Sequence, residues 1–180
     1  MKIAIDPGHG MSNRQSGVYD PGATHRENGF TYQEADIVLR YGLMLRDVIR
    51  ACGHEVFMTR DDANDHMPVS KRAVSAKAAG CQTLVSLHMN DAEVDTAHGL
   101  EVLYRDDKSL AEKLQAELVE VTRLRDRGAK ARPDLAVLKF NGQAVLVELG
   151  FIANDNDRNT LLDTAMREKV CHAIANVLLS

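Results

Sequence analysis

Three polar side chains that could take part in catalysis, His9, His88 and Glu148, directly follow apolar runs of the sequence. Each run has the length and composition of a buried strand. In a mostly parallel α/β sheet the carboxyl ends of the strands lie along one edge, where such sheets bind ligands. Two histidines and a carboxylate at that edge predict a metal site or an acid–base site.

His9 stands in a stiff turn, Asp6-Pro7-Gly8-His9-Gly10, directly after the apolar residues 2–5. Proline fixes its own φ, and glycine adopts backbone conformations that other residues resist, so this stretch ends the strand abruptly. Taken alone, His9 is more simply interpreted as a hydrogen-bonded structural histidine, and His88 as a capping or core histidine. The other candidates decide between these interpretations and a functional one.

Glu34 becomes a fourth candidate through helix geometry. At about 100° per residue, it points the same way as Val38, Tyr41 and Leu45, in the middle of the apolar face of a helix predicted over 32–51. Charged residues are unusual on such a face. Glu34 is therefore a first-turn glutamate favoured by the helix dipole, a glutamate exposed to solvent where the apolar face frays, or a carboxylate aimed at the sheet edge as a metal ligand.

Two imidazole nitrogens and one carboxylate oxygen form a catalytic zinc set that leaves one position open for water. Zinc lowers the pKa of that water and polarises a carbonyl oxygen. A separate base then takes the proton of the water and passes it to the leaving amine, and a glutamate in an apolar pocket suits this role. Glu148 fits it best, because it follows an apolar strand and precedes a turn at Gly150. The residues alone leave the identity of the metal open.

Alternating apolar strands and amphipathic helices predict a single α/β domain over 1–180, with a mostly parallel sheet flanked by helices on both faces. A polar loop is expected over 11–31 and a charged connector over 123–133. The predicted helices cover 32–51, 68–79, 109–122, 156–162 and 164–179, and the predicted strands cover 2–5, 55–59, 82–87, 98–104, 135–138 and 144–147.

Composition excludes several classes of protein. A net charge of −4 without a basic stripe argues against a nucleic-acid partner, and aromatic residues make up only 4% of the 180 residues. No apolar run approaches the ~20 residues of a membrane span, so membrane insertion is not expected. The first residues lack the apolar segment of a cleavable signal. We expect the three cysteines, Cys52, Cys81 and Cys171, to be buried free thiols.

With these residues in place, the chain resembles the zinc-dependent N-acetylmuramoyl-L-alanine amidases, which include bacterial cell-wall amidases and phage endolysins. The matching motifs occur in the order of that family and cover nearly the whole chain. They are Ile5-Asp6-Pro7-Gly8-His9-Gly10, Gln33-Glu34-Ala35-Asp36-Ile37-Val38-Leu39, Thr59-Arg60-Asp61-Asp62, Val85-Ser86-Leu87-His88-Met89-Asn90, Asp126-Arg127-Gly128 and Val147-Glu148-Leu149-Gly150-Phe151-Ile152-Ala153-Asn154.

The resemblance implies a twisted, mostly parallel sheet between helices, with His9, Glu34 and His88 as Zn²⁺ ligands and Glu148 as the catalytic carboxylate. The implied reaction is hydrolysis of the amide between N-acetylmuramic acid and L-alanine in peptidoglycan. We expect a monomer that is made in the cytoplasm and acts on the cell wall after release, as a phage or prophage endolysin does. The alternatives are a zinc peptidase that cuts within the stem peptide and a non-catalytic wall-binding module.

Two features depart from the pattern of the family. The segment between His9 and Glu34 is longer than usual and contains His25 and Glu27, so Glu27 is an alternative carboxylate ligand. No insertion before the last strand is long enough for the autoinhibitory helix of some regulated members, which predicts an open site. Arg127, although part of a motif, is expected in a surface segment where it could contact peptidoglycan.

Overall fold

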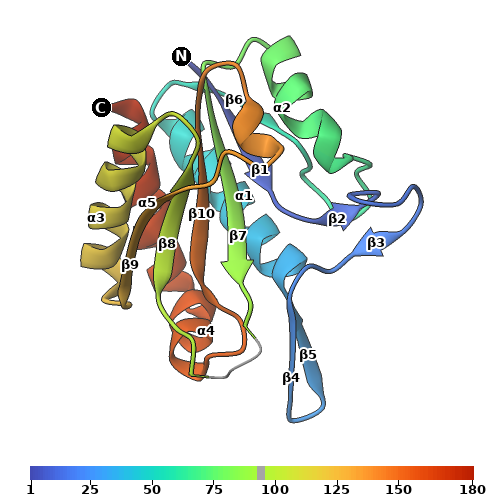
Figure 1. Cartoon of the computed structure of the whole chain (residues 1–180), viewed down its shortest axis with the longest axis vertical. Coiled ribbons are helices and arrows are strands. Elements are labelled where there is room, and N and C mark those ends of the chain that lie inside the picture. The colour runs from blue at the N-terminus through green and yellow to red at the C-terminus, as the bar shows by residue number, and fades with distance from the viewer. Residues whose placement is uncertain (93–95) are drawn as a thin grey trace.

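The computed structural model of the chain describes residues 1–92 and 96–180. Its centre is a twisted six-stranded sheet with the strand order β6-β1-β7-β10-β8-β9, shown in Figure 1. The strands are β1 (Lys2–Pro7), β6 (Glu55–Met58), β7 (Thr83–Asn90), β8 (Leu100–Tyr104), β9 (Asp126–Ala131) and β10 (Gln143–Phe151). Neighbours among β6, β1, β7 and β10 are parallel, whereas β8 runs antiparallel to β10 and parallel to β9. The predicted mostly parallel sheet is confirmed.

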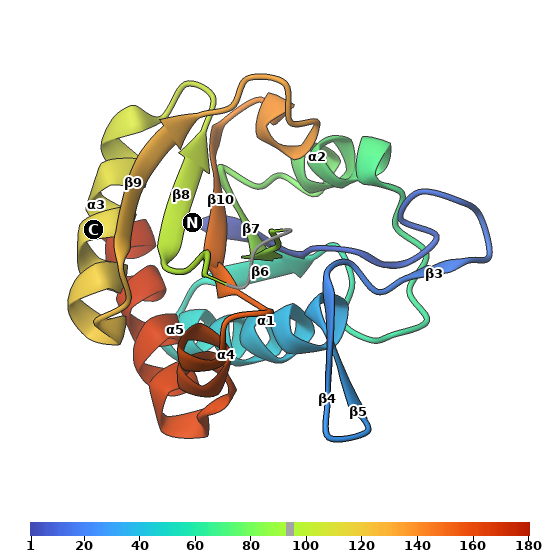
Figure 2. The ribbon, with the colours of Figure 1, turned by 60° about the horizontal axis from the view of Figure 1, so that its bottom comes forward.

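Helices cover both faces of the sheet, as predicted. They are α1 (Glu34–Ala51), α2 (Val69–Ala78), α3 (Lys108–Thr122), α4 (Asp155–Leu162), α5 (Thr164–Leu179) and a 3₁₀-helix, η1 (Val137–Lys139). The larger core packs α1, α3 and α5 against one face, and the smaller core packs α2 and η1 against the other. Figure 2 shows α1 and α5 on one side of the sheet and α2 on the opposite side.

The apolar runs of the sequence follow from this two-sided cover. Successive side chains of a strand point to opposite faces. Ile3 and Ile5 of β1 accordingly join the larger core, while Ala4 between them joins the smaller one. Apolar residues on both faces of a central strand are thus buried in one core or the other, which produces a nearly continuous apolar run instead of an alternating one.

The region expected to be a loop over 11–31 forms two small hairpins. The first pairs β2 (Gly10–Met11) with β3 (Tyr19–Asp20), and the second pairs β4 (Thr24–Glu27) with β5 (Phe30–Gln33). The predicted helix start at residue 32 was therefore wrong by two residues, because residues 30–33 pair in β5 before α1 begins. The second hairpin projects from the body of the molecule (Figures 1 and 2).

Two further predictions were wrong. The charged connector over 123–133 contains β9, and the strand expected over 135–138 is two irregular residues followed by the start of η1. β9 lies at the edge of the sheet and is partly exposed, so it carries the charges of a surface segment instead of an apolar run. Residues 135–138 are apolar because they pack in the smaller core beside α2.

Two of the three cysteines are buried free thiols, as expected, but Cys52 is exposed. It directly follows α1, where the chain turns at Gly53 toward β6. Among the described residues, no helix combines the length and the apolar character that a membrane crossing requires.

Candidate metal centre and catalytic carboxylate

Three elements bring His9, Glu34 and His88 together. His9 follows β1, Glu34 is the first residue of α1, and His88 lies within β7. The carboxylate stands between the two imidazoles: its Oε2 is 3.1 Å from His9 Nε2, and its Oε1 is 2.9 Å from His88 Nδ1. The two imidazole rings lie edge to face with their centroids 4.9 Å apart. The three side chains offer a compact set of donor atoms.

The turn after β1 allows this close approach. Gly8 donates its N–H to the carbonyl of Leu87, which draws the turn against β7. A Cβ at position 8 would lie 2.3 Å from His88 Cε1, so only glycine leaves room for that imidazole. The next residue, His9, has a left-handed backbone with φ of 61°, a conformation that is uncommon outside glycine and is held here by its surroundings.

Glu34 is ionised, and each of its two carboxylate oxygens contacts an imidazole and a backbone N–H group. It is 2% exposed, and its two oxygens also accept hydrogen bonds from the backbone N–H groups of Met89 (2.9 Å) and Ala23 (2.8 Å). Burial by itself would raise the pKa of Glu34, but the hydrogen bonds from His88 and His9 outweigh burial and lower it. The same carboxylate raises the pKa of His88, against the opposing effect of burial.

Asp20 of β3 orients His9. Its Oδ2 lies 3.0 Å from His9 Nδ1 and accepts a second hydrogen bond from Asn13 at 2.7 Å. Burial opposes ionisation of Asp20, but the hydrogen bonds from Asn13 and His9 lower its pKa to about 2. A carboxylate on one imidazole nitrogen fixes the ring and directs the other nitrogen toward a metal. The sequence did not predict this residue, because Asp20 lies in an irregular segment with no periodicity to reveal its direction.

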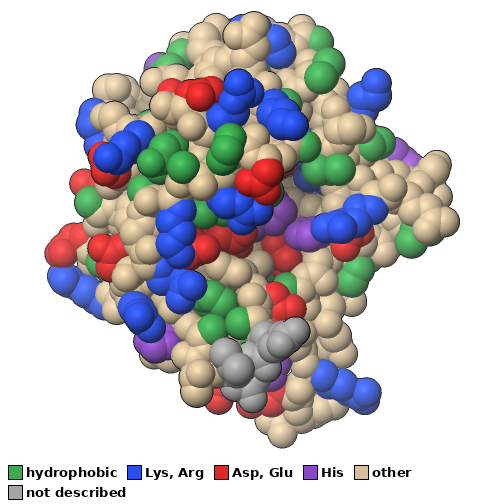
Figure 3. All heavy atoms as spheres, in the orientation of Figure 1, with side chains coloured by type: hydrophobic (Ala, Val, Ile, Leu, Met, Phe, Trp, Pro, Cys, Tyr) green, Lys and Arg blue, Asp and Glu red, His purple; other side chains and the backbone are tan. Residues whose placement is uncertain are grey.

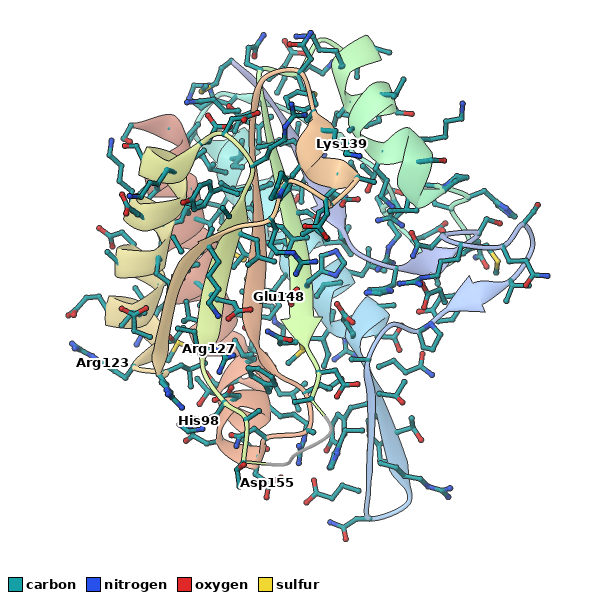
Figure 4. The ribbon with its side chains drawn as sticks, viewed as in Figure 1. His98, Arg123, Arg127, Lys139, Glu148 and Asp155 are labelled. Atoms are coloured by element: carbon teal, nitrogen blue, oxygen red, sulfur yellow. The ribbon has the colours of Figure 1, made fainter. Side chains whose placement is uncertain are left out.

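Glu148 lies in β10 beside His88 of the neighbouring β7, and the two residues are register partners. Both were expected just past the ends of their strands but lie within them. Figure 4 shows Glu148 over the middle of the sheet. Its Oε2 is buried and has no hydrogen-bond partner among the described residues. Burial raises the pKa of Glu148 to about 7, with the charge of His88 opposing the shift and that of Glu34 adding to it.

A second carboxylate, Glu101 of β8, is the antiparallel register partner of Glu148. It accepts hydrogen bonds from Arg127 Nε (2.8 Å), from Asn90 (3.1 Å) and from Lys130. Like charges placed directly opposite each other on a sheet repel, and here the two cations of β9 neutralise one partner. Arg127 is therefore tied to the fold, with its guanidinium 4.8 Å from the Phe151 ring centroid, and its side chain is 27% exposed.

Buried arginines hold the turn that carries His9. Arg72 of α2 donates to Asp6 Oδ1 at 2.7 Å and to the carbonyl of His9 at 2.6 Å. Arg60 donates to the carbonyls of Pro7 and Gly8, at 2.9 and 2.8 Å. Arg72 and Arg60 are 2% and 1% exposed. Asp6 thus supports the turn through its ion pair with Arg72.

The donor set fits a zinc ion. Zinc–nitrogen and zinc–oxygen bonds of about 2.0–2.1 Å in a tetrahedron place neighbouring ligand atoms about 3.3 Å apart. The carboxylate oxygens lie 2.9 and 3.1 Å from the facing imidazole nitrogens, close to that spacing. Three protein ligands leave one position free, and Glu148, whose Oε2 has no hydrogen-bond partner among the described residues, lines the same cavity.

Glu27, the alternative carboxylate, lies elsewhere. It groups with His25 and Asp155, and Arg158 donates to both Glu27 Oε2 and Asp155 Oδ1 at 2.8 Å. A guanidinium already neutralises the two carboxylates of this second group. The arrangement joins the projecting hairpin to α4.

The candidate residues open onto a cleft. A cavity of about 570 Å³ is lined by His9, Glu34, His88 and Glu148. Its lining residues come from strands and loops, with Glu34 as the one helical member. The cleft lies on the face that carries α2 and η1, because His88 and Glu148 alternate with the residues of the larger core. A substrate can therefore reach the candidate residues from solvent.

Comparison with known proteins identifies the family. The model of the N-acetylmuramoyl-L-alanine amidase family matches residues 3–180. The chain belongs to this family. Among solved structures, the amidase from Clostridium difficile 630 superposes with a TM-score of 0.87 at 26% identity, over 99% of this chain and 94% of that one. The fold and the enzyme class expected from the sequence are thereby confirmed: the chain is a peptidoglycan amidase.

Two relatives show how much of longer proteins the chain covers. YqiI of Bacillus subtilis is 31% identical over 97% of this chain and 81% of its own length. The probable cell wall amidase LytH of Staphylococcus saprophyticus is 28% identical over 98% of this chain but only 56% of its own length. The chain thus spans about half of the LytH proteins.

Proposed function

We propose that the protein hydrolyses the amide between N-acetylmuramic acid and L-alanine in a zinc-dependent reaction. His9, Glu34 and His88 would hold the metal, and Glu148 would serve as the catalytic carboxylate, within a catalytic domain that spans residues 1–180. The observation that carries the proposal is the compact His–Glu–His donor set in a cavity that Glu148 also lines, with the buried Oε2 of Glu148 lacking a hydrogen-bond partner among the described residues.

Zinc bound to this set supplies a Lewis acid that acidifies water and polarises a carbonyl oxygen. The role of Glu148 follows from its surroundings. A carboxylate with a pKa of about 7 is poised both to accept a proton from the attacking water and to donate one to the departing alanine nitrogen. Glu34, whose pKa is lowered, remains ionised and suits a ligand instead. The different environments of the two glutamates therefore suit Glu34 to metal binding and Glu148 to proton transfer.

The test is the chemistry of the newly formed ends. Purified protein is incubated with peptidoglycan, and the amino groups that appear are identified by amine labelling and hydrolysis. We expect L-alanine as the new terminus, loss of turnover with a chelator, and recovery when zinc is added. Release of any other amino terminus would indicate a peptidase, and turnover by Glu148→Gln at the wild-type rate would refute the assignment of Glu148.

We further propose that the protein works alone and as a monomer, as an endolysin of phage or prophage type that acts on the cell wall. The support is the open cleft, since its lining holds no helix of the described chain other than the start of α1. Purified protein added to permeabilised cells should lower their turbidity without any activating partner. A strict requirement for a second protein, or a solution mass of twice the chain, would contradict this proposal.

A further inference from the structure

The cleft divides into two adjoining cavities that meet at His9 and His88, two of the three candidate metal ligands. The larger, of about 570 Å³, contains Glu148 and Arg132, and the smaller, of about 350 Å³, contains Val69 and Val137. Both cavities share the residues His9, Arg14, His88, Leu135 and Leu146. The scissile bond would lie at this junction, so the two halves of the substrate would extend into different cavities.

The role of Glu148 as proton donor determines which half of the substrate occupies which cavity. A carboxyl group that protonates a leaving nitrogen must lie within hydrogen-bond reach of it. Glu148 lines the larger cavity, so the alanine nitrogen, and with it the stem peptide, extends into that cavity. The smaller cavity, where Val69, Ala136 and Val137 provide an apolar wall, remains for the lactyl and sugar side.

Arg132 lines the larger cavity, where it can contact the stem peptide. It follows β9 directly, and its Nε and Nη2 donate to Asp134 at 2.9 and 2.8 Å. Its Nη1 makes no hydrogen bond to any described residue, and its side chain is 47% exposed. The pair with Asp134 therefore holds the guanidinium in one orientation with an N–H edge free for another acceptor.

The charge of Arg132 interacts with that of Glu148, a residue that lines the larger cavity. Its hydrogen bond to Asp134 raises its pKa most, and the charges of Glu148 and Glu101 raise it further, so it lies within electrostatic reach of Glu148. Arg14 is the other arginine of the larger cavity, but it also belongs to the smaller one and stands 3.6 Å from Asp20. Figure 3 shows histidine atoms in a hollow of this face with lysine or arginine side chains on both sides.

We propose that Arg132 sets substrate specificity by binding a free carboxylate of the stem peptide in the larger cavity. The inference rests on the proposed amidase function, because that function assigns the direction of the substrate. The residue that follows L-alanine in the stem peptide carries a carboxylate that is either free or amidated. Arg132 favours the free acid, since an amide offers a guanidinium no negative charge.

The test separates binding from turnover. Isothermal titration calorimetry measures the binding of N-acetylmuramoyl-L-alanyl-D-glutamic acid γ-methylamide, and of the corresponding α-amide, to zinc-loaded Glu148→Gln protein, so that the two ligands differ only in whether the α-carboxylate is free. The comparison is repeated with Arg132→Gln and Arg132→Lys added. Arg105→Gln is the matched control, because Arg105 also pairs with a nearby aspartate, at 3.2 Å with 42% exposure, and is not among the residues that line the two cavities. KM and kcat of the corresponding proteins with intact Glu148 are measured on both compounds.

We expect the free acid to bind about fivefold more tightly than the amide, the size of effect that a partly exposed ion pair provides. Arg132→Gln should remove this preference by weakening the acid alone, Arg132→Lys should keep part of it, and Arg105→Gln should keep all of it. The change in turnover should appear in KM and not in kcat. Equal effects of Arg132→Gln on both ligands, or none on either, would overturn the inference. Failure of the wild-type protein to hydrolyse either compound would count against the amidase proposal, whereas the binding preference is decided separately.

Discussion

At the scale of single residues, the site rests on two glutamates with opposite surroundings. Glu34 is surrounded by four donors, whereas Glu148 has a buried oxygen without a partner among the described residues. Helix periodicity pointed to Glu34, and a carboxylate after an apolar run pointed to Glu148. Asp20 could not be found in this way, because its role depends on how an irregular segment folds back over His9.

The burial of Glu148 makes the stability of the metal-free protein depend on pH. Its pKa is about 7 in the folded protein against 4.5 when free, so between these values the folded state binds more protons than the unfolded state. The free energy of unfolding therefore falls as the pH rises through this range. Glu148→Gln abolishes this loss. The free energy of unfolding of Glu148→Gln relative to that of the wild type should therefore rise by about 2 kcal/mol between pH 5 and pH 8, a figure reduced because Glu148 is partly exposed.

Urea denaturation in the presence of a chelator measures this difference. Glu117→Gln, at an exposed position of α3, is the control and should track the wild type at both pH values. A constant difference between Glu148→Gln and wild type from pH 5 to pH 8 would contradict the raised pKa.

Asp20→Asn tests the orientation of His9. The carboxylate lies 3.0 Å from His9 Nδ1, and loss of such a partner usually weakens metal binding about 10- to 100-fold. Competition against a chromogenic chelator measures the zinc affinity. Asp47→Asn is the control, because Asp47 pairs with the adjacent Arg46 at an exposed position of α1. Unchanged affinity in Asp20→Asn would remove Asp20 from the support of the site.

At the scale of elements, the site depends on how α2 and the turn after β1 are joined. Arg72 bridges them, and it lowers the pKa of the buried Asp6, together with Ser86 and Thr59, against the opposing effect of burial. The long apolar strands and amphipathic helices were predictable because each has a strong period. β9 and the small hairpins were not, since edge strands and short pairs carry mixed polar residues whose pairing is set by neighbours distant in sequence.

Arg72→Met should therefore destabilise the protein strongly. It leaves the buried Asp6 without its cation, and loss of one partner of a buried ion pair costs about 3–5 kcal/mol. The neighbouring Lys71→Met, at an exposed position of the same helix, should change the free energy of unfolding little. Urea denaturation of the two variants provides the comparison, and a loss below about 1 kcal/mol in Arg72→Met would contradict this account of the turn.

At the scale of the whole molecule, the fold places its larger core on the side of α1, α3 and α5 and its open cleft on the other side. The two cores are built from apolar side chains and need no metal to pack. The candidate ligands, in contrast, come from three elements that are distant in sequence. A metal bound there links β1, α1 and β7. Sequence periodicity predicted these layers, but which face stays open depends on the packing of α2 and η1.

Zinc should therefore stabilise the whole fold by mass action. At a free zinc concentration of 100 times Kd, the free energy of unfolding should rise by about 2.7 kcal/mol. His88→Ala should lose this gain, whereas His172→Ala, at an exposed position of α5, should keep it. Chemical denaturation with and without zinc measures both, and equal gains in the two variants would place the metal elsewhere.

One zinc ion should bind between His9, Glu34 and His88, in the cavity that Glu148 also lines. Anomalous diffraction at the zinc edge from crystals of the zinc-loaded protein tests it most directly. We expect one strong anomalous peak bonded to His9 Nε2, His88 Nδ1 and an oxygen of Glu34, with Glu148 beside the ion but not bonded to it. A peak at His25, Glu27 and Asp155 instead, or Glu148 bonded in place of Glu34, would contradict it.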